Sequence, residues 1–134
     1  MRRNIGNLFI ITCVLLTVVV WLAFPPENDG RANFTRQYAG EIIGSINIVL
    51  MAAALFLSTR PKWAEKYFGG LDKMYVTHRR VATTAFLLIF VHVLTVPISA
   101  QWVLGNYLAV VAFTGIVATV LVSLAPRIAF LNKL

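Results

Sequence analysis

The sequence predicts an all-α integral membrane protein, a four-helix bundle with both chain termini in the cytoplasm. Composition is the first reason, because 59% of the 134 residues are hydrophobic and only 13% are charged. A soluble domain of this size could not cover so much apolar sequence with its polar residues. The second reason is the uneven placement of Lys and Arg beside the apolar runs. The formal charge of +7 therefore reflects membrane topology and implies no nucleic-acid partner.

The first apolar run follows Arg2 and Arg3 and extends over about residues 8–24. Its basic flank and its length are typical of a signal-peptide core, but no small-residue cleavage site follows, and two prolines come next instead. We therefore expect an uncleaved transmembrane helix. Cys13 is the single cysteine and lies in this run, so neither a disulfide nor a thiolate metal cluster can form within the chain.

A polar loop over about residues 25–37 precedes the second expected helix, residues 38–58. Gly40 and Gly44 form a pair of small residues that allows close approach of a neighbouring backbone or of a flat cofactor, and plain helix packing is the favoured explanation. Asn47 lies deeper in the same helix. Because an unpaired amide is costly in an apolar medium, we expect Asn47 to bond to a partner across the bundle.

A basic segment over about residues 60–80 follows and holds six of the twelve Lys and Arg residues. Three of its aromatic side chains are expected to form a belt at the membrane interface: Trp63, Tyr67 and Phe68. A Gly-Gly pair then marks a turn. The third helix is expected over residues 72–98 and the fourth over 103–124, with Pro126 closing the fourth.

The distribution of Lys and Arg tests this topology. Ten of these residues lie on the amino-terminal side of the four spans, and only Arg31 and Arg36 lie on the other side. Because Lys and Arg are enriched on the cytoplasmic side, the bias places both termini in the cytoplasm and runs the third helix outward. We expect a multi-pass protein of the bacterial inner (plasma) membrane, in contact with the lipid bilayer.

The two histidines of the chain, His78 and His92, both belong to the third helix or its boundary. Fourteen helical residues rise about 21 Å and turn about 1400°, close to a whole number of turns, so both imidazoles project from one face at two depths. A histidine inside an apolar span indicates a functional site, but a hydrogen bond to another helix or an ordinary interfacial position is the alternative. Ala82 and Ala85 on the same face leave room for a flat macrocycle.

Short motifs surround these histidines: Leu57-Ser58-Thr59-Arg60-Pro61, Glu65, Phe68-Gly69-Gly70-Leu71-Asp72-Lys73-Met74-Tyr75, His78-Arg79-Arg80 and His92. Together they resemble the ferric reductase-like transmembrane domain, the family that includes NADPH oxidases and ferric-chelate reductases. The resemblance covers the second and third helices and their loop. It implies two b-type haems (haem b), with His78 as an axial ligand of the inner haem iron and His92 of the outer one.

Such haems pass electrons across the membrane, and two axial histidines make a low-spin carrier with no open site for oxygen. Haem propionates also need cations. Arg79 and Arg80 lie at the depth of the inner haem, and Arg36 lies at the outer end of the second helix, where it could serve the outer haem. These assignments compete with ordinary interfacial roles for the three arginines.

The family's domain has six helices and a second histidine pair on the fifth, whereas this sequence has four expected helices and no third histidine. It contains no flavin- or nicotinamide-binding region and no expected catalytic residue, so it is not a complete reductase. Three interpretations remain. The favoured one is the N-terminal half of a b-type cytochrome, completed by another membrane subunit or by a symmetric copy. The second is a haem-free accessory subunit of a larger membrane complex, and the third is a fragment of a longer reductase.

Overall fold

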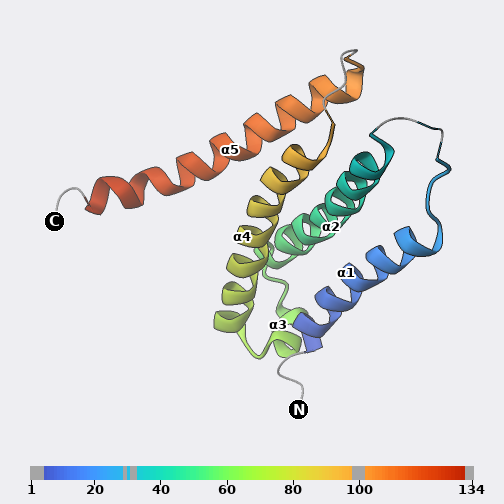
Figure 1. Ribbon diagram of the computed structural model, residues 1–134. Coiled ribbons are helices and arrows are strands. Elements are labelled where there is room, and N and C mark those ends of the chain that lie inside the picture. Colours follow the sequence, from blue (N-terminus) through green and yellow to red (C-terminus); the bar gives the residue numbers. More distant parts are fainter. Residues whose placement is uncertain (1–4, 29, 31–32, 98–101, 132–134) are drawn as a thin grey trace. The chain divides into compact units, whose positions relative to one another are not determined.

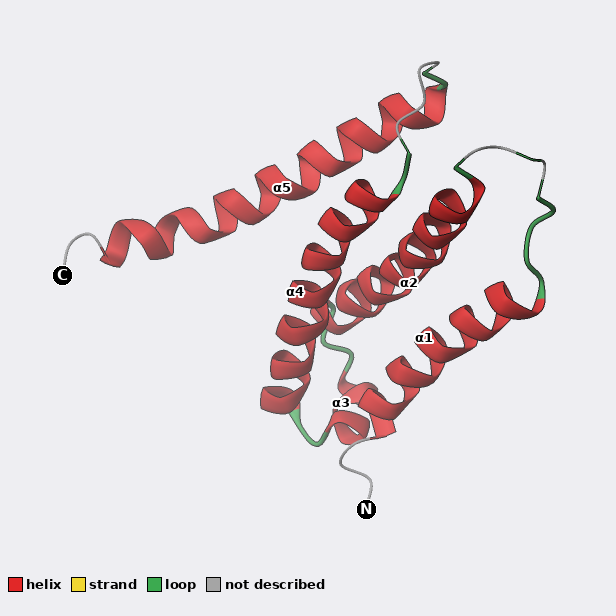
Figure 2. Ribbon diagram, in the orientation of Figure 1, coloured by secondary structure: helices red, strands yellow, loops and turns green. Residues whose placement is uncertain are grey.

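The computed structural model describes residues 5–28, 30, 33–97 and 102–131. The helices are α1 (Ile5–Ala23), α2 (Phe34–Ser58), α3 (Lys62–Phe68), α4 (Leu71–Thr95) and α5 (Leu104–Leu131) (Figure 1). Figure 2 shows that loops connect these helices and that the described residues form no strand. The expected all-α membrane fold is therefore confirmed.

The chain divides into two compact units. The first, Met1–Pro97, contains α1 to α4 and carries both histidines, and the second, Ile98–Leu134, contains α5. Within the first unit, α2 and α4 run antiparallel and side by side, and α1 lies against α2 (Figure 1). The packing of this unit positions the candidate site.

Among the described residues, three helical stretches are long and apolar enough to cross a membrane: Ile5–Ala23, Phe34–Ser58 and Leu104–Ala125. The helix α4 is as long as α2 but does not belong to this set, because its two arginines and two histidines lower its hydropathy. That α4 forms a fourth span stays a prediction, supported by its packing along α2. The side of the membrane on which the termini lie also stays a prediction, and Arg2, Arg3, Arg31 and Lys133 lie outside the described residues.

Two predictions about helix boundaries were wrong. Lys62–Phe68 form a short helix, α3, where a loop was expected; Pro61 precedes it in an extended conformation and suits a helix start. The helix α5 continues through Pro126 to Leu131, although Pro126 was expected to close it. A proline inside a helix removes one backbone hydrogen bond and bends the helix, but it does not by itself end it. The connection expected at residues 99–102 lies mostly outside the described residues.

The turn between α3 and α4 depends on two glycines. Gly69 has a φ of 81° and Gly70 a φ of 107°, values that residues with a side chain rarely adopt. The N–H of Gly70 donates to the carbonyl of Glu65 at 2.9 Å, and the carbonyl of Gly70 accepts from the N–H of Met74 at 3.0 Å. The turn therefore closes α3 and starts α4 with hydrogen bonds on both sides.

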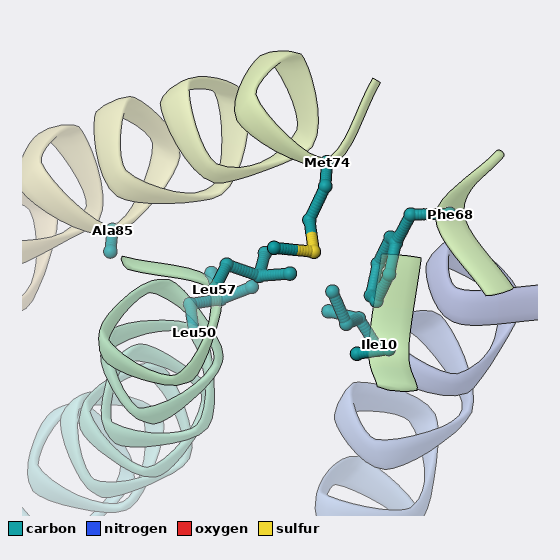
Figure 3. Close-up of a cluster of buried hydrophobic side chains, with 7 residues drawn as sticks. Ile10, Leu50, Leu57, Phe68, Met74 and Ala85 are labelled. Atoms are coloured by element: carbon teal, nitrogen blue, oxygen red, sulfur yellow. The ribbon is translucent and has the colours of Figure 1, made fainter. Parts of the chain in front are cut away.

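A buried cluster joins all four helices of the first unit. Met74 of α4 and Leu57 of α2 are 1% and 2% exposed, and Figure 3 shows Met74 reaching between Leu57 and Phe68. Phe68 was expected in the interfacial aromatic belt, but it is buried, because a short amphipathic helix turns Ala64 and Phe68 inward together. Its ring lies so close to Gly6 that a Cβ there would be 2.5 Å from it.

Candidate functional site

His78 faces α2 from the first half of α4. Its Nδ1 lies 2.9 Å from the carbonyl oxygen of Ala54. A carbonyl oxygen only accepts hydrogen bonds, so Nδ1 carries the hydrogen and donates it. In the neutral imidazole this leaves the lone pair on Nε2, which is the atom that can ligate a metal.

His92 makes the same interaction near the other end of α4. Its Nδ1 lies 2.9 Å from the carbonyl oxygen of Gly40, so this ring also donates from Nδ1 and keeps its lone pair on Nε2. Both rings are half-buried. The two imidazoles therefore project from one face of α4, as their spacing predicts.

The two acceptors on α2 have the same spacing as the two donors on α4. Gly40 and Ala54 are separated by 14 residues, as are His78 and His92. Because the helices are antiparallel, both bonds form in a single register. This is a repeat of two heptads, the period at which two helices stay in continuous contact.

The glycine pair of α2 lies under the second of these bonds. A Cβ on Gly44 would lie 2.8 Å from Cε1 and 3.0 Å from Nδ1 of His92, and a Cβ on Gly40 would lie 2.7 Å from Cγ2 of Val96. Distances below 3.0 Å are essentially never seen for real Cβ atoms, so a side chain at either glycine would have to displace His92 or Val96. The pair therefore serves helix packing, which was the favoured explanation, and it seats the imidazole of His92 directly on the backbone of α2.

Ala85 does not leave the room that the sequence predicted. It is buried at 4% exposure and belongs to the core cluster together with Leu50 and Leu57 of α2. The small side chain lets α2 and α4 approach each other, so α2 takes the space expected for a macrocycle at this position. Ala82 is half-buried.

An open cavity of about 470 Å³ lies beside His78, between the end of α2 and the start of α4. Polar side chains contribute to its lining: Ser58, Arg60, Asp72, Tyr75 and His78. His92 does not line this cavity. The surroundings of the two histidines therefore differ although their hydrogen bonds are alike.

The three arginines proposed from the resemblance occupy different positions. Arg79 and Arg80 are exposed on α4 immediately after His78. Arg36 lies near His92, but its guanidinium is engaged: Nε donates to the carbonyl of Thr95 at 2.8 Å and an η nitrogen donates to that of Leu94 at 2.7 Å. Arg36 thus stabilises the C-terminal end of α4, where carbonyl groups lack helical partners and a cation is favoured.

Asn47 lies midway between the two histidine bonds and is 5% exposed. Its Nδ2 lies 3.8 Å from the sulfur of Met51 on its own helix, and its Oδ1 has no hydrogen-bond partner among the described residues. The prediction of a partner across the bundle is therefore wrong for the part of the chain that the structure describes. Ala85, which can offer no side-chain partner, stands at the corresponding position of α4.

Sequence reasoning missed a connection between α1 and α2. Trp21 donates from Nε1 to Oγ of Ser45 at 2.9 Å, and the hydroxyl of Tyr38 donates to the carbonyl of Trp21 at 2.6 Å. Ser45 directly follows Gly44, so α1 supports the part of α2 on which His92 rests. Nothing in the sequence pairs these residues, which lie on separate apolar helices.

The chemistry of the site comes from two separated imidazoles. Within the described residues, no group of three or more His, Cys, Asp or Glu side chains comes together to hold a metal ion. Each histidine offers one oriented nitrogen lone pair, which suits the axial position of a haem iron.

A comparison with models of protein families matches the part of the chain that contains both histidines. The family model described as "Ferric reductase like transmembrane component" matches residues 43–130, which include both histidines and the two arginines that follow His78. Comparison with curated proteins and with solved structures gave no match.

Proposed function

Since the chain belongs to the ferric reductase-like transmembrane family, we propose that it is an electron-transfer component of a membrane, with haem b held by His78 and His92. One observation carries this proposal. Each imidazole donates its Nδ1 hydrogen to a main-chain carbonyl of α2 and keeps Nε2 for ligation. Histidines that ligate metals characteristically make such a second hydrogen bond, which sets the tautomer and the ring orientation.

The spacing of the two histidines supports transfer across the bilayer. Fourteen helical residues separate them by about 21 Å along α4, within a hydrocarbon core of about 30 Å. When bound, haem b would take up and release one electron at a time. The two histidines would hold the haems at two depths, which would divide the path of the electron across the bilayer into shorter steps.

Each haem would need a further ligand from beyond these residues, because the two histidines of the sequence would be divided between two haems. We propose that another subunit, a continuation of the chain or a symmetric copy supplies it. A two-fold axis along the membrane normal would bring equivalent histidines to equal depths. Neither His78 nor His92 is fully buried in this chain, which leaves each of them open to such an approach.

Cations for the haem propionates belong to the same proposal. Arg79 and Arg80 are exposed beside His78 and donate no side-chain hydrogen bond to any other described residue, so they suit the inner haem. Arg36 would have to share its guanidinium with the end of α4 in order to serve the outer haem. The proposed orientation keeps His78 nearer the cytoplasm, in a bacterial inner membrane.

An absorption difference spectrum tests the proposal. Reduced minus oxidised spectra of the purified protein should show a b-type α band, and His78→Ala and His92→Ala should each remove about half of the bound haem, since each histidine would hold one of the two haems. Thr84→Ala, at an exposed position of the same helix, is the matched control and should leave the band unchanged. A colourless protein that still inserts into membranes would contradict the proposal.

The second candidate is a haem-free accessory subunit of a membrane complex. The observation that favours it is the same pair of hydrogen bonds, because two histidines bonded to α2 already serve as ties between helices. In that case the spectrum is blank, and both histidine variants lose thermal stability without any change in colour.

A further inference from the structure

A large apolar cavity lies away from the face that carries the histidines, at the junction of α1, α2 and α3. Its volume is about 570 Å³, it is open on one side, and its lining is almost wholly apolar. Side chains from all three helices form the walls, among them Phe9, Cys13, Val49, Phe56, Trp63 and Tyr67. Cavities of this size accommodate a ligand of several tens of atoms, and this lining suits a hydrocarbon chain.

Two lysines of α3 stand beside this cavity. Nζ of Lys66 lies 4.9 Å from the ring centroid of Tyr67, and that ring lines the cavity. Lys62 is exposed one turn earlier, next to Trp63, which also lines the cavity. Glu65 is the one acidic residue of α3, so the helix is basic overall. Neither lysine lines the cavity itself, but both are sequence neighbours of residues that do, so positive charge lies close to the apolar interior.

We infer that this cavity binds an anionic phospholipid, with an acyl chain in the apolar interior and the phosphate at Lys62 and Lys66. Basic pockets between membrane helices bind anionic headgroups, whose charge compensates the lysines. Trp63 is 63% exposed beside the cavity, as expected for an aromatic side chain at the level of the headgroups. A zwitterionic lipid offers the same acyl chain without the net charge.

This site is separate from the proposed haem ligands, because its lining includes neither histidine nor Ala54 or Gly40, whose carbonyls accept from them. A lipid bound in this cavity would affect the position of α3. The lipid would contact α1, α2 and α3 together and would hold α3 in place, and α3 leads through Gly69 and Gly70 into α4.

Fluorescence quenching by brominated lipid tests the inference. The full chain with Trp21→Phe and Trp102→Phe keeps Trp63 as its single tryptophan. In nanodiscs of phosphatidylcholine, an equal small fraction of brominated phosphatidylglycerol should quench Trp63 at least twofold more than brominated phosphatidylcholine. The double variant Lys62→Gln and Lys66→Gln should remove this preference. Lys73→Gln, on α4 rather than on α3, is the matched control and should keep it.

A second variant tests the apolar half of the site without changing charge. Ala52 lines the cavity, so Ala52→Phe should fill part of it and reduce the preference. Circular dichroism should show unchanged helicity in every variant compared. Equal quenching by the two brominated lipids in the parent protein, or no quenching at all because α5 or a second copy fills the cavity, overturns the inference.

Discussion

The His78 and His92 sites each contain a hydrogen bond from Nδ1 to a main-chain carbonyl of α2, but the residues around the two imidazoles differ. His92 rests on Gly44, with Arg36 at the adjacent end of α4 and Trp21 bonded behind it to Ser45. His78 instead borders an open cavity of about 470 Å³. Equal spacing along the helix therefore does not produce equal sites. Packing within this chain builds the His92 site, whereas the His78 site remains accessible.

The largest effect is expected from a side chain at Gly44. Gly44→Val should force the imidazole of His92 away from Gly40, and overpacking of this kind costs about 1–3 kcal/mol. Unfolding of the purified protein in mixed detergent micelles, followed by circular dichroism, measures the loss. The ¹⁵N signal of His92 should shift, while that of His78 should not.

Gly115→Val is the matched control, because a Cβ at Gly115 would meet no atom within 4 Å. Valine has a higher intrinsic helix propensity than glycine, so this control should not destabilise the protein. If Gly44→Val lowers the free energy of unfolding no more than Gly115→Val does, the close contact between His92 and Gly44 is wrong.

The second effect has the opposite sign and concerns the position between the two sites. Asn47→Leu should raise the free energy of unfolding by about 1–2 kcal/mol, because it removes a buried amide whose Oδ1 has no partner in the described part of the chain. The same micelle titration measures the gain. A loss of stability would show that Asn47 bonds to a group that the described residues do not include.

A smaller loss is expected at the end of α4. Arg36→Gln removes two hydrogen bonds from a charged donor to the carbonyls of Leu94 and Thr95, and because Arg36 is exposed the cost should be about 1 kcal/mol. Arg79→Gln, at an exposed position beside the other histidine, is the comparison and should cost less. Loss of outer haem without loss of stability in Arg36→Gln would instead favour a propionate contact.

The smallest effect should come from the support behind the His92 site. Ser45→Ala removes the acceptor of the Trp21 side chain and should cost about 0.5–1 kcal/mol. Emission of Trp21 should change, and the ¹⁵N signal of His92 should respond more than that of His78. Equal responses of the two histidines would mean that α1 supports both sites alike.

The sequence predicted the helices well where composition decides them. Long apolar runs predicted α1 and α2 within four residues at each end and the start of α5 within one, but not the end of α5, and the 14-residue interval predicted that both histidines share a face. The fate of Ala85 could not be predicted, because small residues look the same whether a cofactor or a neighbouring helix takes the space. Which neighbour packs against a small residue depends on tertiary packing, which the local sequence does not determine.

Local residue types also misled at α3. Trp63, Tyr67 and Phe68 read as one interfacial group, but a helix of seven residues turns Phe68 inward and Trp63 outward. The role of Arg36 was equally invisible, since its acceptors are main-chain carbonyls on a helix nearly 60 residues away. Main-chain acceptors have no signature in side-chain sequence, and the same holds for the carbonyls of Gly40 and Ala54.

The matched intervals on α2 and α4 have a consequence for assembly in the membrane. A single hydrogen bond between two helices would still allow α4 to pivot about that contact. Two bonds separated by 14 residues on both partners oppose that pivoting and favour one register, because a displacement of α4 along α2 breaks both bonds at once. Because both histidines belong to one helix, the depth of one in the bilayer determines the depth of the other.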